Sequence, residues 1–255
     1  EQLGFDSFIT DFGVGGCTNF LDGVNYGSSG AGILDETGSL SGELFTMNIQ
    51  LYNHKITVSR IGKQLGSDEV AKKYLSQCIY VTDMGHNDYL NNYFLDIPTT
   101  AARCMPSNTL QHPNELDDNS CAYKLNEDIQ IFNTKLQTLI RELDGKYEDA
   151  AFTYINSYEI DSDKTNEAFK FTRESCCNVM ASGGVPCKSL TIPCANRSEY
   201  VYWDGAHFTE AKAWNFGKRA YKRQSSRDAY PYDISELVQL KLHDNDGDIV
   251  NHAQL

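Results

Sequence analysis

The sequence predicts an α/β domain whose mostly parallel β-sheet is covered by helices on both faces. Segments with apolar residues at helical spacing alternate along the chain with short β-rich runs, which is typical of such a sheet. The 255 residues are enough for one domain with a real core, and no segment has the length and composition of a linker between domains. Active sites of parallel sheets lie at the carboxyl ends of strands. We therefore expect the functional residues in loops that follow the β-rich runs.

The first helix is predicted over residues 44–65, because its apolar positions recur at intervals of three and four residues. Gly66 ends this pattern, and Ser67 caps a second, short helix. The run Cys78–Thr82 follows as a predicted buried strand. The positions that define the helical face are Leu44, Met47, Leu51, His54, Val58, Ile61 and Leu65.

The same alternation recurs downstream. A second long helix is predicted over residues 125–143 and is stopped by Gly145, and residues 151–156 form the next predicted strand. A third helix is predicted from near Thr209 to Ala220. The apolar positions that define the second long helix are Leu125, Ile129, Phe132, Leu136, Leu139 and Leu143.

Charge and hydropathy narrow the classes of partner. The net charge is −13, which argues against a nucleic-acid partner because phosphate contacts need clustered Lys and Arg. The same acidity disfavours binding to an anionic membrane, and no apolar stretch is long enough to span one. The chain begins without Met or a signal-like segment, so we expect either that targeting has been removed or that the sequence is a fragment.

The eight cysteines favour disulfides rather than a metal site. None lies in a CxxC pair and no His has zinc-finger spacing from two of them, so we expect no structural zinc. Cys176, Cys177, Cys187 and Cys194 crowd a Gly/Pro-rich stretch and suggest a stapled loop, whose pairing the sequence leaves open. Asn196 begins an Asn-Arg-Ser glycosylation sequon. Together these features predict a secreted, cell-wall or vacuolar glycoprotein.

A first candidate motif is the loop Asn25–Ile33, which consists mainly of small residues. Glycines such as Gly30 let backbone N–H groups approach a ligand or an oxyanion closely. A structural turn is the alternative interpretation.

A second candidate motif, Gly85–Tyr89, directly follows the predicted strand Cys78–Thr82. The Asn87 amide can donate a hydrogen bond to a developing oxyanion, and Asp88 can accept backbone donors that hold the loop in shape. The alternative is an Asx-type turn that closes a strand. His86 has no visible partner that would make it a base.

The third motif is Asp204-Gly205-Ala206-His207, before the third helix. An Asp three residues before a His can hold the imidazole tautomer that acts as a general base. A capping Asp beside an ordinary loop His is the alternative.

In this order, the three motifs resemble the GDSL or SGNH hydrolases, specifically the plant esterase/lipase branch. The resemblance extends from Glu1 to about Leu240 and implies a three-layer α/β/α, flavodoxin-like sandwich over residues 1–240, followed by an acidic tail at 241–255. The residues that carry it are Gly23-Val24-Asn25-Tyr26, Ser28, Gly30, Gly32-Ile33, Gly85, Asn87–Phe94, Cys176-Cys177, Pro193-Cys194, Asn196-Arg197, Tyr200, Trp203-Asp204, His207 and Thr209-Glu210-Ala211.

The resemblance also implies a reaction and roles for four residues. Gly30, through its backbone N–H, and Asn87, through its side-chain amide, become oxyanion-hole donors. His207 becomes the general base, and Asp204 orients it. The implied reaction is acyl transfer from a small-molecule carboxylic ester, such as an acyl lipid or an acetyl ester, to a Ser and then to water, without a cofactor.

One block of the family pattern does not occur in these 255 residues. The family carries its nucleophile in a Gly-Asp-Ser-Leu turn, whereas here Asp6-Ser7 follows Phe5. The resemblance places that Ser, with its strand and helix, before residue 1. We therefore expect an incomplete domain that lacks its first strand, and a preceding segment of the same protein that supplies the nucleophile. The alternatives are an inactive relative that binds ligands or serves storage or defence, and a replacement nucleophile at Ser28 or Ser29.

Two smaller features of the sequence depart from known patterns. Phe208 and His86 stand where relatives usually carry Pro and a small polar residue, and neither change removes a catalytic group. Asp244, Asp246 and Asp248 have the spacing of the first EF-hand ligands, but Ile249 occupies the Gly position and no Glu ends the loop. We therefore expect a solvated acidic tail there instead of a calcium site.

Overall fold

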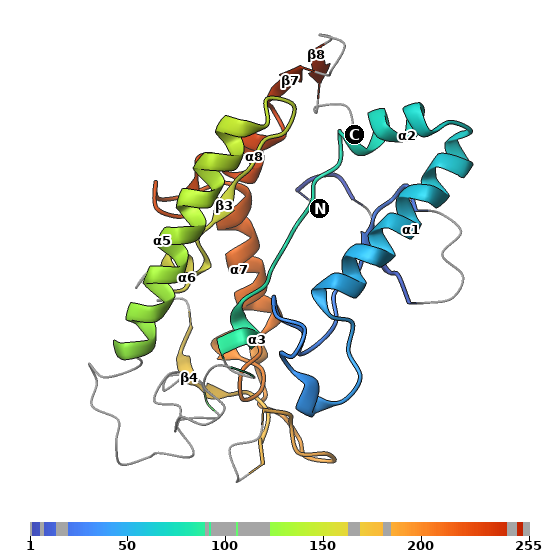
Figure 1. Ribbon diagram of the computed structural model, residues 1–255. Coiled ribbons are helices and arrows are strands. Elements are labelled where there is room, and N and C mark those ends of the chain that lie inside the picture. Colours follow the sequence, from blue (N-terminus) through green and yellow to red (C-terminus); the bar gives the residue numbers. More distant parts are fainter. Residues whose placement is uncertain are drawn as a thin grey trace. The chain divides into compact units, whose positions relative to one another are not determined.

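The computed structural model describes residues 2–5, 8–13, 20–89, 92, 106, 123–162, 169–180, 185–243 and 249–251. The chain divides into two compact units, Glu1–Pro98 and Thr99–Gln254, and both contain helices and short strands (Figure 1). This mixed α/β composition agrees with the predicted class. A single domain over residues 1–240 stays a prediction. In the part of the chain described, no helix has the length and apolar character needed to cross a membrane.

The unit Glu1–Pro98 contains the first two predicted helices, with the predicted end at Gly66 and the predicted cap at Ser67. Thr46 Oγ1 accepts the Ile49 N–H at the start of α1, and Gly66 ends that helix with φ 79°. Ser67 Oγ accepts two N–H groups at the start of α2. The elements are β1 (Thr10–Asp11), β2 (Val24–Asn25), which pairs with β1 in parallel, η1 (Ser39–Ser41), α1 (Met47–Leu65), α2 (Asp68–Leu75) and α3 (His86–Asp88).

The core of this unit lies where α2 packs against the C-terminal half of α1. Ile61 of α1 and Ala71 of α2 are buried there with Phe20. On α1 the buried positions are Asn53, Thr57, Ile61 and Gly62. The predicted apolar face is therefore buried at Ile61, which packs beside Ala71 of α2, and exposed at Leu51.

The prediction of a buried strand at Cys78–Thr82 is wrong. The segment is extended between α2 and α3 (Figure 1), but it belongs to no ladder in the described residues. Ile79, Tyr80 and Val81 are exposed. A buried strand needs hydrogen-bonded neighbours and covering side chains, and the described part of Glu1–Pro98 provides neither for this segment.

The unit Thr99–Gln254 contains the other two predicted helices. The second long helix, α5, runs one residue past Gly145, and Thr209 Oγ1 caps α7 by accepting the Lys212 N–H. The elements are α5 (Tyr123–Lys146), β3 (Tyr154–Ile155), α6 (Ser157–Ser162), β4 (Phe171–Ser175), η5 (Arg197–Glu199), β5 (Tyr200–Tyr202), α7 (Glu210–Tyr221), β6 (Ala229–Tyr230), α8 (Ile234–Leu237), β7 (Lys241–His243) and β8 (Ile249–Asn251).

The strands form short pairs where a mostly parallel sheet was expected. Among the described residues there are four two-stranded sheets: β1–β2 and β4–β5 are parallel, whereas β3–β6 and β7–β8 are antiparallel. Of the predicted strand 151–156 only Tyr154 and Ile155 pair, antiparallel to Ala229–Tyr230. Within the predicted acidic tail 241–255, β7 and β8 pair antiparallel, and Asp244, Asp246 and Asp248 lie outside the described residues. That the tail is solvated stays a prediction.

A buried ion pair fixes the C-terminal end of α7. Arg219 Nη2 lies 2.6 Å from Asp228 Oδ1, and the Asp228 side chain is almost fully buried. Burial by itself would raise the pKa of Asp228, but the bonds from Arg219 and from the backbone N–H groups of Ser225 and Gln224 outweigh it and lower the pKa. The helix that follows the Asp204–His207 motif is thus fastened at its far end.

Candidate active site

The Asp204–His207 motif forms a tight loop between β5 and α7. The loop folds back on itself, since the Trp203 N–H donates to the His207 carbonyl at 2.8 Å and the Thr209 N–H donates to the Val201 carbonyl at 2.9 Å. An isolated antiparallel bridge joins Tyr202 to Phe208. The end of β5 and the N-cap of α7 therefore define the position of His207.

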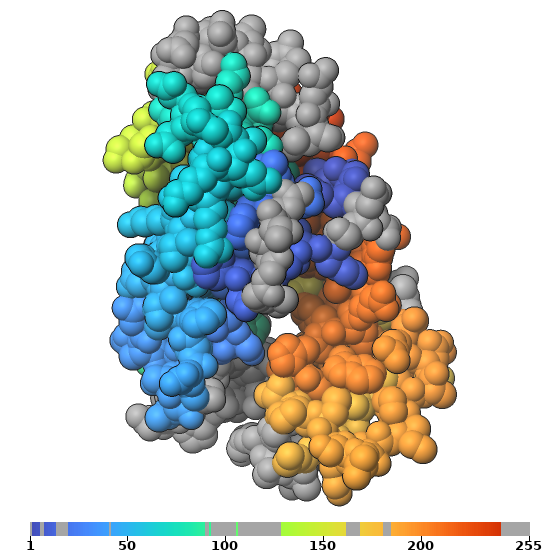
Figure 2. Space-filling view, turned by 90° about the vertical axis from the view of Figure 1, so that its right-hand side faces the viewer, coloured from blue at the N-terminus to red at the C-terminus, as the bar shows by residue number. Residues whose placement is uncertain are grey.

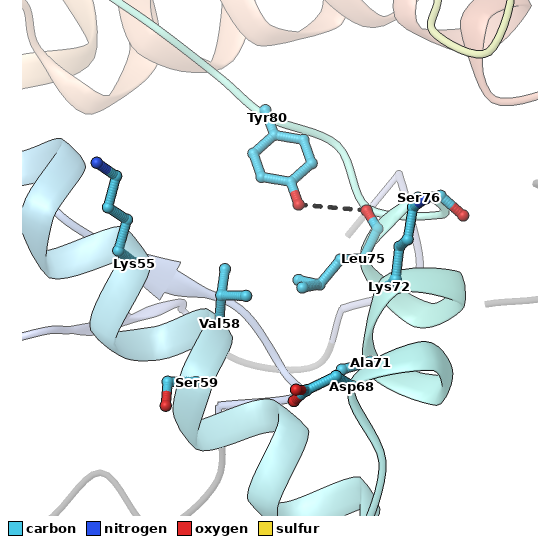
Figure 3. A pocket seen from close by; sticks show the side chains of 9 residues that line it. All are labelled: Lys55, Val58, Ser59, Asp68, Ala71, Lys72, Leu75, Ser76 and Tyr80. Atoms are coloured by element: carbon cyan, nitrogen blue, oxygen red, sulfur yellow. Dashed lines mark hydrogen bonds between the residues drawn. The ribbon is translucent and has the colours of Figure 1, made fainter.

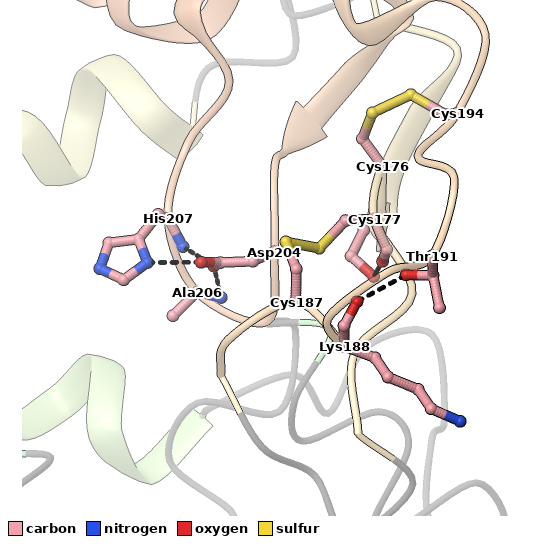
Figure 4. Close-up of a disulfide and its surroundings, with 10 residues drawn as sticks. Cys176, Cys177, Cys187, Lys188, Thr191, Cys194, Asp204, Ala206 and His207 are labelled. Atoms are coloured by element: carbon pink, nitrogen blue, oxygen red, sulfur yellow. Dashed lines mark hydrogen bonds and ion pairs between the residues drawn. A yellow bond between two sulfur atoms is a disulfide. The ribbon is translucent and has the colours of Figure 1, made fainter.

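The Asp204 carboxylate organises this loop (Figure 4). Asp204 Oδ1 accepts the backbone N–H groups of Ala206 at 2.9 Å and His207 at 2.7 Å, and Oδ2 lies 2.8 Å from His207 Nδ1. Asp204 is buried, whereas the His207 side chain is 71% exposed. With its Nδ1–H donated to the carboxylate, the neutral ring keeps Nε2 as its acceptor, which is the tautomer of a general base. Asp204 therefore caps the turn and also contacts the imidazole, and the role of His207 as a general base stays a prediction.

Two disulfides brace the His207 loop from one side (Figure 4). Cys176 pairs with Cys194 and Cys177 with Cys187, which confirms the stapled loop and gives its pairing. The Cys177 N–H donates to the Trp203 carbonyl at 2.9 Å, and the Gly205 N–H donates to the Val185 carbonyl at 2.9 Å. The disulfide loop and the His207 loop are therefore hydrogen-bonded directly to each other.

The second carboxylate, Asp88, fastens the loop that carries Gly30. It accepts the backbone N–H groups of Ile33 at 2.8 Å and Leu34 at 3.0 Å, and the Thr37 hydroxyl at 2.8 Å. A Cβ at Gly32 would lie 2.5 Å from this carboxylate, so the close approach requires glycine. Burial would raise the pKa of Asp88, but these hydrogen bonds lower it below its usual value. Asp88 accepts backbone donors as predicted, but those described here belong to the Gly30 loop and not to the Gly85–Tyr89 loop for which the role was predicted.

Asn87 lies against the same loop, so the two predicted oxyanion donors are brought together. Asn87 Nδ2 donates to the Ala31 carbonyl at 2.9 Å. Gly30 precedes Ala31 in a turn closed by the Ala31 N–H to the Ser28 carbonyl, and its φ of 83° suits glycine. Ser28 Oγ accepts the Phe45 N–H at 2.9 Å, which gives this hydroxyl a structural role.

A cavity in the unit Glu1–Pro98 was not predicted from the sequence. It has a volume of about 580 Å³ and lies between α1, α2 and the extended segment at Tyr80 (Figure 3). Tyr80 Oη donates to the Leu75 carbonyl at 3.2 Å. Its lining mixes charged and apolar side chains that no motif connects: Lys55, Val58, Ser59, Asp68, Ala71, Lys72, Leu75, Ser76 and Tyr80.

Sequence reasoning also missed a buried cation near His207. Lys212, on α7, is almost fully buried, and its Nζ lies 2.9 Å from Asp161 Oδ1 of α6 and 5.6 Å from the Phe208 ring centre. A lysine in the first turns of a helix gives no sign of burial in a sequence. In the described ranges, no cluster of three His, Cys, Asp or Glu side chains could hold a metal ion.

The predicted site residues thus form two groups. Asp204 and His207 lie in the unit Thr99–Gln254, and Gly30 and Asn87 lie in the unit Glu1–Pro98. Within each group the two residues lie close together, through the His207–Asp204 contact and the Asn87–Ala31 hydrogen bond. That all four serve one active site stays a prediction.

Comparison with known proteins gives one consistent result. The family model described as "GDSL-like Lipase/Acylhydrolase" matches residues 1–219. The chain is 35% identical to GDSL esterase/lipase At1g29660 of Arabidopsis thaliana and 36% identical to GDSL esterase/lipase At4g18970 of the same plant. Each alignment covers 94% of this chain and 78% of the relative. No solved structure matches the chain. With a family model matched over most of its length, the chain belongs to the GDSL-like lipase/acylhydrolase family.

Proposed function

We propose that the protein hydrolyses carboxylic esters through a Ser-His-Asp triad whose His and Asp are His207 and Asp204. The observation that carries the proposal is the 2.8 Å contact between Asp204 Oδ2 and His207 Nδ1, with the imidazole otherwise exposed. A His held by a carboxylate in this way can accept a proton at Nε2. Relatives at 35–36% identity bear the name esterase/lipase, which supports the same reaction class.

The nucleophile of the proposed reaction lies outside these 255 residues, because the Gly-Asp-Ser block does not occur among them. Its hydroxyl would attack the ester carbonyl carbon while His207 Nε2 takes the hydroxyl proton. The tetrahedral intermediate then collapses to an acyl-serine. The alcohol departs and takes the proton from His207 Nε2. Water then attacks the acyl-serine by the same route, giving the carboxylic acid and free Ser.

Gly30 and Asn87 are the proposed oxyanion donors. The turn at Gly30 and the Asn87 amide lie together through the Asn87–Ala31 hydrogen bond, and Asp88 holds the loop from behind. Donors that are fixed before the reaction stabilise developing charge without a cost of reorganisation. A small-molecule ester is the proposed substrate.

Secretion to the cell wall or delivery to the vacuole is the proposed location. Two disulfides among the described residues support an oxidising compartment. Asn196 is exposed at the N-cap of η5, where a glycan on its side chain would meet solvent.

The natural protein tests this proposal through a serine-reactive phosphonate probe and a p-nitrophenyl ester assay. We expect turnover, and we expect the labelled peptide to contain a Ser that precedes residue 1 of this sequence. N-terminal sequencing and intact mass identify the segment that carries it. If the natural protein neither turns over esters nor takes the label, it is an inactive ligand-binding or storage relative. A label on Ser28 or Ser29 would instead show a replacement nucleophile.

A further inference from the structure

The segment Cys187–Cys194 is a loop fastened at both ends to neighbouring residues. Cys187 is bonded to Cys177 and Cys194 to Cys176, so adjacent cysteines hold the two ends of the loop. Backbone bonds reinforce the base, from the Lys188 N–H to the Asn178 carbonyl and from the Cys194 N–H to the Cys176 carbonyl, both 2.7 Å. The base of this loop, which we name the clamp loop, is therefore fixed covalently and by hydrogen bonds.

The tip of the clamp loop presents apolar side chains to solvent. Leu190 is fully exposed and Ile192 is 89% exposed. Leu190 also has φ 61°, a conformation that costs a branched side chain about 1–2 kcal/mol. Thr191 Oγ1 donates to the Lys188 carbonyl at 2.7 Å and closes the tip from inside (Figure 4). A folded protein keeps two such side chains exposed on a fixed loop at a cost, which points to a function for the tip.

Charge around the clamp loop differs from that of the whole chain. The chain carries a net charge of −13, yet residues 175–198 contain no Asp or Glu and include Lys188 and Arg197. In Figure 2 the light-orange segment that includes this loop lies at the surface. Apolar side chains beside basic ones, without acidic ones, are typical of surfaces that enter a lipid–water interface.

The clamp loop is also joined to the loop that carries His207. Val185, two residues before Cys187, accepts the Gly205 N–H, and Cys177 donates to the Trp203 carbonyl. The base of the clamp loop and the backbone around the proposed general base therefore belong to one hydrogen-bonded assembly.

We propose that the clamp loop is an interfacial docking element: Leu190 and Ile192 insert into the surface of a lipid layer, and Lys188 contacts its anionic headgroups. The docking itself requires no chemistry, but its value for turnover rests on the proposed ester hydrolysis. The proposed docking specifies the substrate as an ester presented at a lipid surface rather than an ester dissolved in water.

Flotation of the natural, full-length protein with vesicles of phosphatidylcholine and phosphatidylglycerol tests the proposal. We expect Leu190→Ser with Ile192→Ser to weaken partition onto vesicles by at least about tenfold, since two apolar side chains lose their burial in lipid. Lys188→Glu should weaken binding to the mixed vesicles more than to vesicles of phosphatidylcholine alone. Leu40→Ser is the matched control, because Leu40 is 83% exposed and lies outside the loop.

The outcomes separate docking from catalysis. Partition of the double variant equal to that of the unchanged protein would overturn the proposal, as would an equal loss in Leu40→Ser or no binding of the unchanged protein. Hydrolysis is read separately with a soluble p-nitrophenyl ester. A failure of the proposed reaction would abolish that turnover while leaving vesicle binding unchanged, and a failure of docking would do the reverse.

Discussion

The Asp88 and Asp204 loops use the same kind of group over very different chain distances. Each carboxylate accepts two backbone N–H groups and one side-chain donor. The partners of Asp204 lie within three residues of it, whereas those of Asp88 lie 51 to 55 residues away. The orientation of His207 is thus a local property, and the shape of the Gly30 loop depends on the folding of its whole unit.

The two loops also differ in their bracing. The His207 loop is bonded to a segment held by two disulfides, whereas the bonds described for the Gly30 loop are hydrogen bonds centred on one carboxylate. The comparison predicts that thiol reduction disturbs the first loop and acid disturbs the second.

The largest expected effect on kcat comes from a substitution in the His207 loop. In the complete enzyme, His207→Ala should lower kcat by at least about 10³-fold, because the proton of the nucleophile then has no acceptor. Steady-state hydrolysis of a p-nitrophenyl ester measures it, with His54→Gln as the matched histidine control. An unchanged kcat in His207→Ala would show that another residue is the base.

The next largest expected effect comes from a substitution beside the Gly30 loop. Asn87→Ala should lower kcat by about 10²–10³-fold, the usual loss for one oxyanion donor, with a smaller change in KM. Asn92→Ala is a matched control, since the Asn92 side chain donates to Thr37 Oγ1 at 3.2 Å behind the same loop. Equal losses in the two variants would mean that Asn87 acts only by shaping the loop.

The same contrast between local and long-range contacts explains what the sequence could predict. The helices α1, α2 and α7 were predicted, with a cap at Ser67 and a start near Thr209, because periodicity and capping are read from neighbouring residues. The Asp204–His207 contact was predicted for the same reason. Its bonds span three residues.

Features that depend on distant partners were not predictable. Residues 78–82 have the composition of a strand, but a strand forms only with a partner in register, and Val81 is 84% exposed here. Which positions of the predicted α1 face are buried also depends on a neighbour, since Ile61 is buried beside Ala71 of α2 whereas Leu51 is exposed. The pairing of Cys176 with Cys194 and the burial of Lys212 against Asp161 likewise require coordinates.

A smaller effect is expected when the disulfide nearest the His207 loop is removed. Cys177→Ser with Cys187→Ser should destabilise the unit Thr99–Gln254 by about 2–4 kcal/mol, because the unfolded chain is released from a closed ring. Denaturant unfolding followed by far-UV circular dichroism measures it. Hydrogen exchange at the Gly205 amide should rise in the variant, since its acceptor Val185 lies beside Cys187. An unchanged exchange rate there would mean that the disulfide does not brace the loop.

The smallest effect is the acid response of the Gly30 loop. The pKa of Asp88 is lowered in the folded chain, so its contribution to stability is present above its usual pKa of 3.8. That contribution is lost as the pH falls through the lower, folded value, when the protonated carboxyl group no longer accepts the Ile33 and Leu34 N–H groups fully.

Hydrogen exchange at the Ile33 and Leu34 amides measures this response as the pH is lowered from about 5 to about 3, after correction for the intrinsic rate. Protection should fall with pH in the unchanged protein. In Asp88→Asn it should be lower at the start and nearly independent of pH, because the amide oxygen carries no titrating charge. Asp35→Asn removes an exposed carboxylate, bonded to Asn48 Nδ2, and should leave the pH response intact. A pH response that persists in Asp88→Asn would place the acid-sensitive group elsewhere, and the two loops would then not differ in the way their carboxylates predict.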